Sequence, residues 1–203
     1  MLDKNPNQVF DKDLLEIKNK FSEKNLNFIL SSNPFFKTEF LNKLVESADV
    51  PVVFLDFDLL YSGYVNSGII KKNEKLEILV SNGETFIDDI KEIIRKIESK
   101  KSLIILDTLN GLYNMFDELE YVRFINSAIM LLSSVAKYSN SLIVITAMTR
   151  KNESNEYILS PTGRHLFRSK NAGFYNLITS ELGLVLNVLD KTEENVRSFN
   201  IIK

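Results

Sequence analysis

LNFILSSNPFFKTEFLNKL, residues 26–44, is the stretch that decides the fold. An apolar run, Phe28 to Leu30, enters a short polar loop, Ser31 to Pro34. Lys37 and Thr38 follow, and from residue 37 to residue 47 apolar side chains recur at helical spacing. A strand, a polar loop, Lys-Thr and an amphipathic helix in this order are typical of a loop that holds a phosphate group at the start of a helix.

The phosphate-loop pattern is G-x-x-x-x-G-K-[ST], and on this stretch Ser31 and Phe36 occupy its glycine positions. Glycine is needed there so that backbone N–H groups can wrap a phosphate, and the benzyl group of Phe36 would crowd that phosphate. In an intact loop, Lys37 would neutralise the β- and γ-phosphates and Thr38 would hold Mg²⁺. The alternative is that Lys37 and Thr38 merely begin a helix, with Phe35 and Phe36 either plugging the vacant pocket, which we favour, or docking a partner.

The amino-acid composition of the chain excludes several classes of function. The chain has 203 residues, 44% hydrophobic and 26% charged, which predicts one soluble domain. A net charge of −2 excludes a wholly basic nucleic-acid binder. The chain has no cysteine and one histidine, which excludes thiolate sites and a histidine-based zinc site within one chain, whereas oxygen-ligated Mg²⁺ remains open. Without a signal-peptide pattern or an apolar run of about 20 residues, we expect an intracellular, cytoplasmic protein.

Strand-like and helix-like segments alternate as far as Ala147, which predicts right-handed crossovers and a parallel sheet. Beyond it, residues 149–160 predict a polar loop, and the last strands predict hairpins that extend the sheet antiparallel. We therefore expect an α/β fold with a mainly parallel central sheet, flanking helices and C-terminal antiparallel strands. Residues 1–25 would form an N-terminal arm and helix, and residues 26–203 a single domain. The predicted strands are 27–31, 52–56, 76–80, 102–106, 141–147, 174–179, 183–189 and 197–202, and the predicted helices are 11–24, 37–47, 85–99 and 119–138, with a short turn or helix at 108–116.

Acidic residues stand where two predicted strands end. Asp107 follows the apolar run 102–106 and matches a carboxylate that holds Mg²⁺ through water. Asp56 and Asp58 end the run 52–56, where a carboxylate can act as a general base toward water. The plainer alternative is that these residues cap turns. Ligands of open α/β sheets sit at the carboxyl ends of the strands, so we expect these residues to gather with the 31–38 loop and Thr146.

The densest basic segment follows the predicted strand 141–147. Phosphate contacts from such a segment would give salt-dependent nucleic-acid binding, and the alternative is a solvated face without a function. The single histidine, His165, lies in this segment, and we expect no chemical role for it. The candidate nucleic-acid-binding residues are Arg150, Lys151, Arg164, Arg168 and Lys170.

Six segments taken together resemble one family. In order they are SSNPFFKT (31–38), VVFLDFD (52–58), SLIILDT (102–108), SLIVITAM (141–148), PTGRHLF (161–167) and VRSFNIIK (196–203). Their order and spacing resemble the RecA-like ATPase core of the RadA, archaeal recombinase paralogue and KaiC-like group, over residues 26–203. The resemblance implies a RecA-like P-loop NTPase fold, and no single motif in it is intact.

The departures from the family pattern all concern ATP. Asp58 matches the position of the catalytic glutamate but is shorter. Thr146 matches the end of its strand, whereas Ala147 and Met148 replace the usual Asn-Gln pair that includes the amide sensing the γ-phosphate. With Phe36 in the phosphate loop, the chain looks like a member with degenerate Walker motifs, similar to recombinase paralogues and elongator accessory subunits.

The resemblance implies a noncatalytic RecA-fold accessory protein, a pseudo-ATPase that assists DNA recombination or repair. It would work as a homo-oligomer or with a RecA-family partner, with single-stranded DNA as a further partner, and we expect no cofactor. We also expect Lys37→Ala to leave folding unchanged. One alternative is a weak ATPase that uses ATP, Mg²⁺ held by Thr38 and Asp107, and Asp58 as the base. Another is a pure protein-assembly scaffold.

Overall fold

The structure, a computed structural model, describes residues 6–116, 119–162, 164, 166, 169–181 and 183–202. Arg168, His165 and Gly163 therefore lie outside the described residues. The elements are α1 (Pro6–Ser22), β1 (Leu26–Ser31), α2 (Pro34–Glu46), β2 (Val52–Asp56), α3 (Leu60–Asn66), β3 (Leu76–Leu79), α4 (Phe86–Ser99), β4 (Leu103–Asp107), α5 (Leu109–Asn114), α6 (Leu119–Tyr138), β5 (Leu142–Lys151), β6 (Tyr157–Leu159), β7 (Ala172–Ser180), β8 (Gly183–Leu189) and β9 (Asn195–Ile202).

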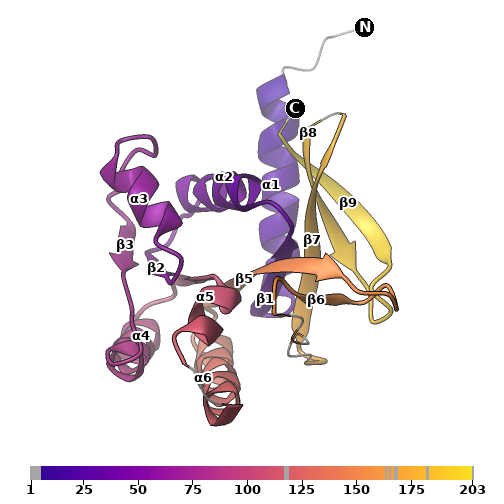
Figure 1. Cartoon of the computed structure of the whole chain (residues 1–203). Coiled ribbons are helices and arrows are strands. Elements are labelled where there is room, and N and C mark those ends of the chain that lie inside the picture. Colours follow the sequence, from indigo (N-terminus) through magenta and orange to yellow (C-terminus); the bar gives the residue numbers. More distant parts are fainter. Residues whose placement is uncertain are drawn as a thin grey trace, which may run out of the picture.

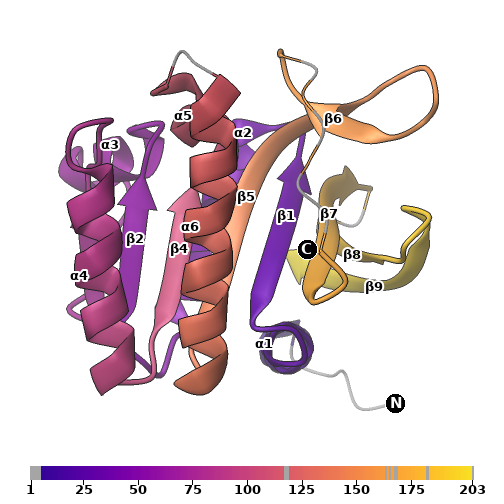
Figure 2. The same ribbon diagram turned by 90° about the horizontal axis from the view of Figure 1, so that it is seen from below.

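One twisted sheet runs through the molecule in the order β3-β2-β4-β5-β1-β7-β8-β9, with β6 paired to β5 (Figures 1 and 2). Strands β1 to β5 pair in parallel, and β8 and β9 add antiparallel pairs. The predicted α/β class, with a mainly parallel sheet and C-terminal antiparallel strands, is confirmed. Strand β7 differs in detail, because it pairs in parallel with β1 and only then does the chain turn back.

The central strands are apolar because helices cover both of their faces. Every residue of β1, β2 and β4 is buried, as expected for strands of a parallel sheet covered on both sides. Side chains alternate across the sheet, so Phe28 packs in a core with α4, α5 and α6, whereas Ile29 packs in a second core with α1, α2 and α3 (Figure 2). Because β1, β2, β4 and β5 run parallel, their carboxyl ends lie at one edge of the sheet.

The segment predicted as a polar loop, residues 149–160, is partly strand. Strand β5 continues to Lys151, and β6 pairs with it antiparallel, with Thr149 opposite Leu159. The hairpin stands beyond the edge where the parallel strands end (Figure 2). The prediction was wrong because the exposed stretch of this hairpin is polar, and polarity alone does not distinguish a solvated hairpin from a loop.

The N-terminal helix α1 packs against the C-terminal strands. Phe21 is fully buried, and its ring meets that of Tyr175 edge-on at 4.8 Å between centroids. Asn27 donates a hydrogen bond to the carbonyl of Phe21, and Glu16 forms an ion pair with Arg197 of β9. The helix thus contributes to the same core as α2 and α3. Among the described residues, no helix combines the length and apolarity that a membrane crossing needs.

Candidate functional site: the carboxyl edge of the sheet

The helix that follows β1 begins three residues earlier than its apolar periodicity predicts. Helix α2 starts at Pro34, so only Ser32 and Asn33 separate it from the strand. Asn33 is the N-cap, and Pro34, which lacks an N–H group, fits the first helical turn. The residues that would wrap a phosphate are therefore the first turn of a helix.

The N–H groups at the start of α2 are occupied by the chain itself. The side-chain oxygen of Asn33 accepts hydrogen bonds from the backbone N–H groups of Phe35, at 2.9 Å, and Phe36, at 3.2 Å. The N–H group of Lys37 donates to the Asn33 carbonyl at 3.2 Å. These donors are the ones that a phosphate would use at a helix N-terminus. A phosphate would have to displace the Asn33 cap to reach them.

Lys37 points into the protein and pairs with the carboxylate predicted to hold Mg²⁺. Its Nζ atom lies 2.6 Å from Oδ1 of Asp107, and neither residue is exposed. The hydroxyl of Thr146 also donates to Oδ1 of Asp107. Oδ2 of Asp107 is buried without a hydrogen-bond partner in the described structure. The charges of Lys37, on α2, and Asp107, at the end of β4, therefore neutralise each other inside the protein.

Asp58 completes the cluster from the end of β2. Its Oδ2 atom accepts a hydrogen bond from the Thr108 hydroxyl at 2.7 Å and lies 3.6 Å from Nζ of Lys37. The same Thr108 hydroxyl accepts from the N–H group of Gly111 at the start of α5. The Asp58 side chain is 29% exposed, so one side of the cluster faces solvent. We call Lys37, Asp58, Asp107 and Thr146 the strand-end cluster.

Burial governs the electrostatics of the strand-end cluster. Burial raises the pKa of Asp107, and the Asp58 carboxylate adds to that effect. The Lys37 ammonium and the Thr146 hydroxyl oppose it by stabilising the ionised form. Asp107 thus depends on Lys37 for its charge, and removing Lys37 would leave a buried carboxylate with only Thr146 to stabilise it.

The other residues of the predicted phosphate loop face elsewhere. The Thr38 hydroxyl, predicted to hold Mg²⁺, is turned back onto the carbonyl of Pro34 at 2.9 Å. Ser31 is buried, and its hydroxyl contacts the backbone of Asn33. Phe36 is half-buried against the core that α2 shares with α1 and α3.

Phe35 and Phe36 differ in exposure. Phe35 is 57% exposed, and its ring meets that of Phe36 edge-on at 5.7 Å between centroids. Because Phe36 packs into the core beside α2 and Phe35 faces solvent, only Phe36 matches the burial that we expected of both.

Two site residues were missed by sequence reasoning. Asn110 donates to the carbonyls of Met148 and Ser160 and accepts from the Met148 N–H group, which ties α5 to the end of β5. At Gly111 an added Cβ would stand 2.3 Å from Oδ1 of Asp58. The Asn-Gly pair in a predicted turn was the available signal, but its partners are distant in sequence.

The candidate nucleic-acid residues fall into two places. Arg150 and Lys151 are exposed on the β5–β6 hairpin, and Lys151 lies over the ring of Tyr157 at 5.1 Å. Arg164 is hydrogen-bonded through its carbonyl to Leu159 of the same hairpin. Lys170 instead precedes β7, near Lys24 and the start of β1. It lies at the opposite edge of the sheet, so the structure does not bring it together with the others. Arg168 lies outside the described residues.

The groups present do not fit ATP with Mg²⁺ in this conformation. The helix N-terminus is capped, Lys37 is paired, and Thr38 is bonded to the backbone. Within the ranges that the structure describes, no group of three or more His, Cys, Asp or Glu side chains is placed so that it could hold a metal ion. Asp56 shares this edge, but its Oδ2 atom accepts a hydrogen bond from the N–H group of Ser62 in the first turn of α3 at 2.7 Å.

Solved structures share the architecture at low sequence identity. The recombinase RadB matches with a TM-score of 0.55 and 7% identity, over 87% of this chain and 86% of its own. A solved ATPase domain matches with a TM-score of 0.54 and 10% identity, over 87% of this chain and 80% of that domain. A DnaB-like replicative helicase, described with its interactions with primase, matches with a TM-score of 0.54 and 12% identity.

That helicase match covers 88% of this chain and 55% of the helicase, so this chain spans little more than half its length. No protein-family model and no curated protein sequence matches the chain. The likeness in structure, together with the strand order, defines a protein of RecA-like fold. At sequence identities of 7–12%, these similarities show the fold and nothing further.

Proposed function

We propose that this chain is a noncatalytic RecA-fold accessory protein, a pseudo-ATPase that assembles with other proteins and assists DNA recombination or repair. The observation that carries the proposal is the start of α2. Asn33 and Pro34 begin the helix where a nucleotide-binding loop would wrap a phosphate, and Lys37 is buried against Asp107. ATP would have to displace the cap and separate a buried ion pair before it could bind.

Nucleotide binding is the first test. A fluorescent ATP analogue with Mg²⁺, titrated against the full chain, should give no saturable signal. Thr38→Val is the control variant, because it removes the hydroxyl that would hold Mg²⁺ and keeps both Lys37 and Asp107. Saturable binding that ATP competes away and that Thr38→Val abolishes would overturn the proposal in favour of a weak ATPase with Asp58 as its base.

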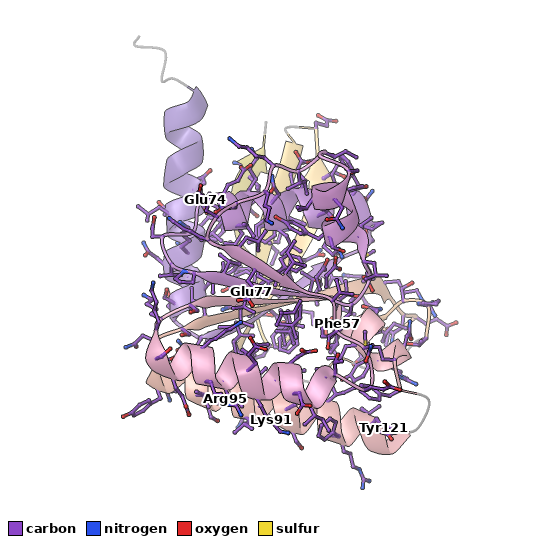
Figure 3. All side chains as sticks on the ribbon, turned by 90° about the vertical axis from the view of Figure 1, so that its left-hand side faces the viewer. Phe57, Glu74, Glu77, Lys91, Arg95 and Tyr121 are labelled. Atoms are coloured by element: carbon purple, nitrogen blue, oxygen red, sulfur yellow. The ribbon has the colours of Figure 1, made fainter. Side chains whose placement is uncertain are left out.

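An exposed aromatic surface supports assembly with a protein partner. Ile87 of α4 is 48% exposed, and Tyr121 and Phe124 of α6 are 42% and 38% exposed. With Phe116, whose ring stacks on Tyr121 at 4.7 Å, they line a cavity of about 770 Å³. Figure 3 shows Tyr121 at the same end of the molecule as Phe57, which follows β2. Asn82 and Glu84 line the cavity too, and exposed aromatic side chains beside polar ones are typical of protein contacts.

The aromatic surface is tested through the oligomeric state. A second copy of the chain or a RecA-fold homologue would bury these rings, so sedimentation velocity of the chain, alone and mixed with such a homologue, should reveal a complex. Tyr121→Ser with Phe124→Ser should weaken that complex. Lys91→Ser with Arg95→Ser is the matched control, because both residues lie on the outer side of α4 (Figure 3). An undiminished complex in the aromatic variant would exclude this surface.

For nucleic acid we propose the β5–β6 hairpin. Lys151 lies over the ring of Tyr157 and Arg164 over the ring of Tyr113, and Arg150 is exposed next to Lys151. Cationic groups next to aromatic rings suit the phosphates and bases of a single strand. Fluorescence anisotropy with single-stranded DNA at two salt concentrations should show binding that salt weakens, and Arg150→Ala with Lys151→Ala should lower the logarithmic salt slope by about 0.7 per lost contact.

Lys170→Ala supplies the control for the hairpin, because that lysine lies at the opposite edge of the sheet. Equal losses from Lys170→Ala and from the hairpin variant would contradict the hairpin as the binding site. A chain that binds protein partners but no single-stranded DNA at either salt concentration would be a pure assembly scaffold.

A further inference from the structure

A second cavity lies at the edge of the sheet opposite the strand-end cluster. It has a volume of about 440 Å³ and lies between the end of α1, the start of β7 and the β8–β9 hairpin. Ala172 in its wall pairs with Leu26 at the start of β1, whereas Ser31 at the other end of β1 pairs with Leu177. Thr146 of the strand-end cluster pairs with Ile29, which lies three residues, or about 10 Å at the usual rise of a strand, along β1 from Leu26. The cavity is at β7, on the other side of β1 from Thr146 and β5, so the two sites are separate. The volume is in the range of small-molecule sites.

The wall of this cavity is apolar. Phe174, Val188, Leu189 and Val196 line it together with Ala172. Phe174 and Leu189 also pack against the main core, and Val188 is buried, so these side chains are held in place. Val196 is 62% exposed and stands at the mouth. A hydrocarbon chain or an aromatic ring entering the cavity would replace water along this wall, which is favourable in proportion to the apolar area covered.

The rim is positively charged. Lys24, Lys170 and Lys191 line the cavity, and in the described part of the chain none of them forms an ion pair with a carboxylate. The Lys24 ammonium group donates a hydrogen bond to the carbonyl of Lys170, at a long 3.3 Å. Three ammonium groups around an apolar pocket can each turn toward one anionic group at its mouth.

The acids at this rim are already engaged. Glu23 pairs with Lys20 at 2.6 Å. Oδ1 of Asp190 accepts hydrogen bonds from the hydroxyl and N–H groups of Thr192 and from the N–H group of Glu194, which close the β8–β9 turn. Counting Lys24, Lys170 and Lys191 against Asp190 leaves two positive charges in excess at the mouth.

We infer that this cavity binds a small amphipathic anion, a carboxylate carried on an aliphatic or aromatic body. The body would lie along Ala172, Phe174 and Leu189, and the carboxylate would meet Lys24, Lys170 and Lys191. The inference is independent of the function proposed for the opposite edge, because the two sites share no residue.

The test compares three head groups on one type of tail by isothermal titration calorimetry with the full chain. Decanoate is the anionic probe, decyltrimethylammonium the cationic one, and decyl maltoside the neutral one, all below their micellar concentrations. Decanoate should bind saturably with one site, more weakly as salt is added, and the other two should bind at least tenfold more weakly. Absence of saturable decanoate binding, or equal binding of all three probes, would overturn the inference.

Two variants locate the site. Lys24→Ala with Lys170→Ala should weaken decanoate binding at least tenfold. Val196→Glu should do the same, because it places a carboxylate at the mouth on an exposed position. Val80→Glu is its matched control, since Val80 is 58% exposed just after β3, far along the sheet. Equal affinities of Val196→Glu and Val80→Glu, with unchanged melting temperatures, would place the ligand elsewhere and refute the site.

Discussion

The ion pair between Lys37 and Asp107 allows a quantitative prediction that separates a structural role from a nucleotide-binding one. Both side chains are buried, and Nζ to Oδ1 is 2.6 Å. Removing one partner of a buried pair leaves an uncompensated charge and costs about 3–5 kcal/mol, whereas replacing both partners is often neutral. Lys37→Met should therefore lower the free energy of unfolding by about 3–5 kcal/mol, or the melting temperature by roughly 6–20 °C for a domain of this size. Lys37→Met with Asp107→Asn should recover most of that loss.

The loss of stability in Lys37→Met should depend on pH, and the sign of that dependence follows from the pKa of Asp107. In Lys37→Met the pKa of Asp107 rises further above its unfolded value, because burial already raises it and the ammonium that opposed burial is gone. Between the unfolded and folded pKa values the native state then holds more protons than the unfolded state. The free energy of unfolding must fall as pH rises through that window, so the deficit of Lys37→Met should be smaller at pH 5 than at pH 7.

The assay is urea unfolding at both pH values, with midpoint and slope compared among the wild type, the two single variants and the double variant. Asp88 and Lys91 provide a matched control, because they form a lysine–aspartate pair at 2.7 Å on the exposed side of α4. Removing that pair should leave the midpoint unchanged. If Lys37→Met leaves the midpoint unchanged, or the two single effects simply add in the double variant, the pair is not structural, and Lys37 is free to meet a phosphate.

Two further predictions concern how α5 meets the strand ends. Gly111→Ala should destabilise the protein and displace Asp58, because the new Cβ would stand 2.3 Å from Oδ1 of Asp58. Gly63→Ala in α3, where the new Cβ has no atom within 4 Å, should instead raise the melting temperature. Equal shifts of the melting temperature in the two variants would contradict the close approach. Asn110→Ala removes three hydrogen bonds to Met148 and Ser160 and should cost about 2–3 kcal/mol. It should also speed amide exchange in the β5–β6 hairpin, and unchanged exchange there would argue against the link.

The fold was predictable because a buried strand is recognisable from a short run of neighbouring apolar residues. The runs VVFLD and LIILD are continuous and apolar, as strands covered on both faces must be, and they indicated the parallel sheet directly. The same reasoning placed Lys37, Asp58, Asp107 and Thr146 at one edge, where the structure brings them together. Strand direction is enough to predict such a meeting, because parallel strands end at the same edge.

What the residues do to one another at that edge was not predictable from local patterns. Lys37 and Asp107 are 70 positions apart, so no local pattern in the sequence shows that they pair. The sequence led us to expect that Lys37→Ala would leave folding unchanged, and the buried pair now leads us to expect the opposite. Our expectation that α2 begins at Lys37 was wrong for a local reason, because Asn-Pro at 33–34 is a strong helix-start signal that the phosphate-loop pattern obscured.

From the sequence we expected Phe36 to prevent nucleotide binding, whereas the structure points to the helix start at Asn33 and Pro34. Two variants distinguish these explanations. If the benzyl group of Phe36 were the obstacle, Phe36→Gly alone would open the loop and permit ATP to bind. If the helix start is the obstacle, Phe36→Gly still leaves Asn33 capping α2 and Lys37 held by Asp107. We therefore expect Phe36→Gly to lower stability, through lost packing and about 1 kcal/mol of helix propensity, without saturable binding of a fluorescent ATP analogue.

Adding Asn33→Gly and Pro34→Gly to Phe36→Gly should free the N–H groups at the start of α2. The triple variant still has Lys37 paired with Asp107, so we expect that it does not bind ATP either. Absent binding in the triple variant would show that the buried ion pair alone is enough to prevent ATP from binding. Binding by Phe36→Gly alone would refute the helix-start argument. Binding by the triple variant only would show that the helix start is the barrier and that Lys37 leaves Asp107 when a phosphate is offered.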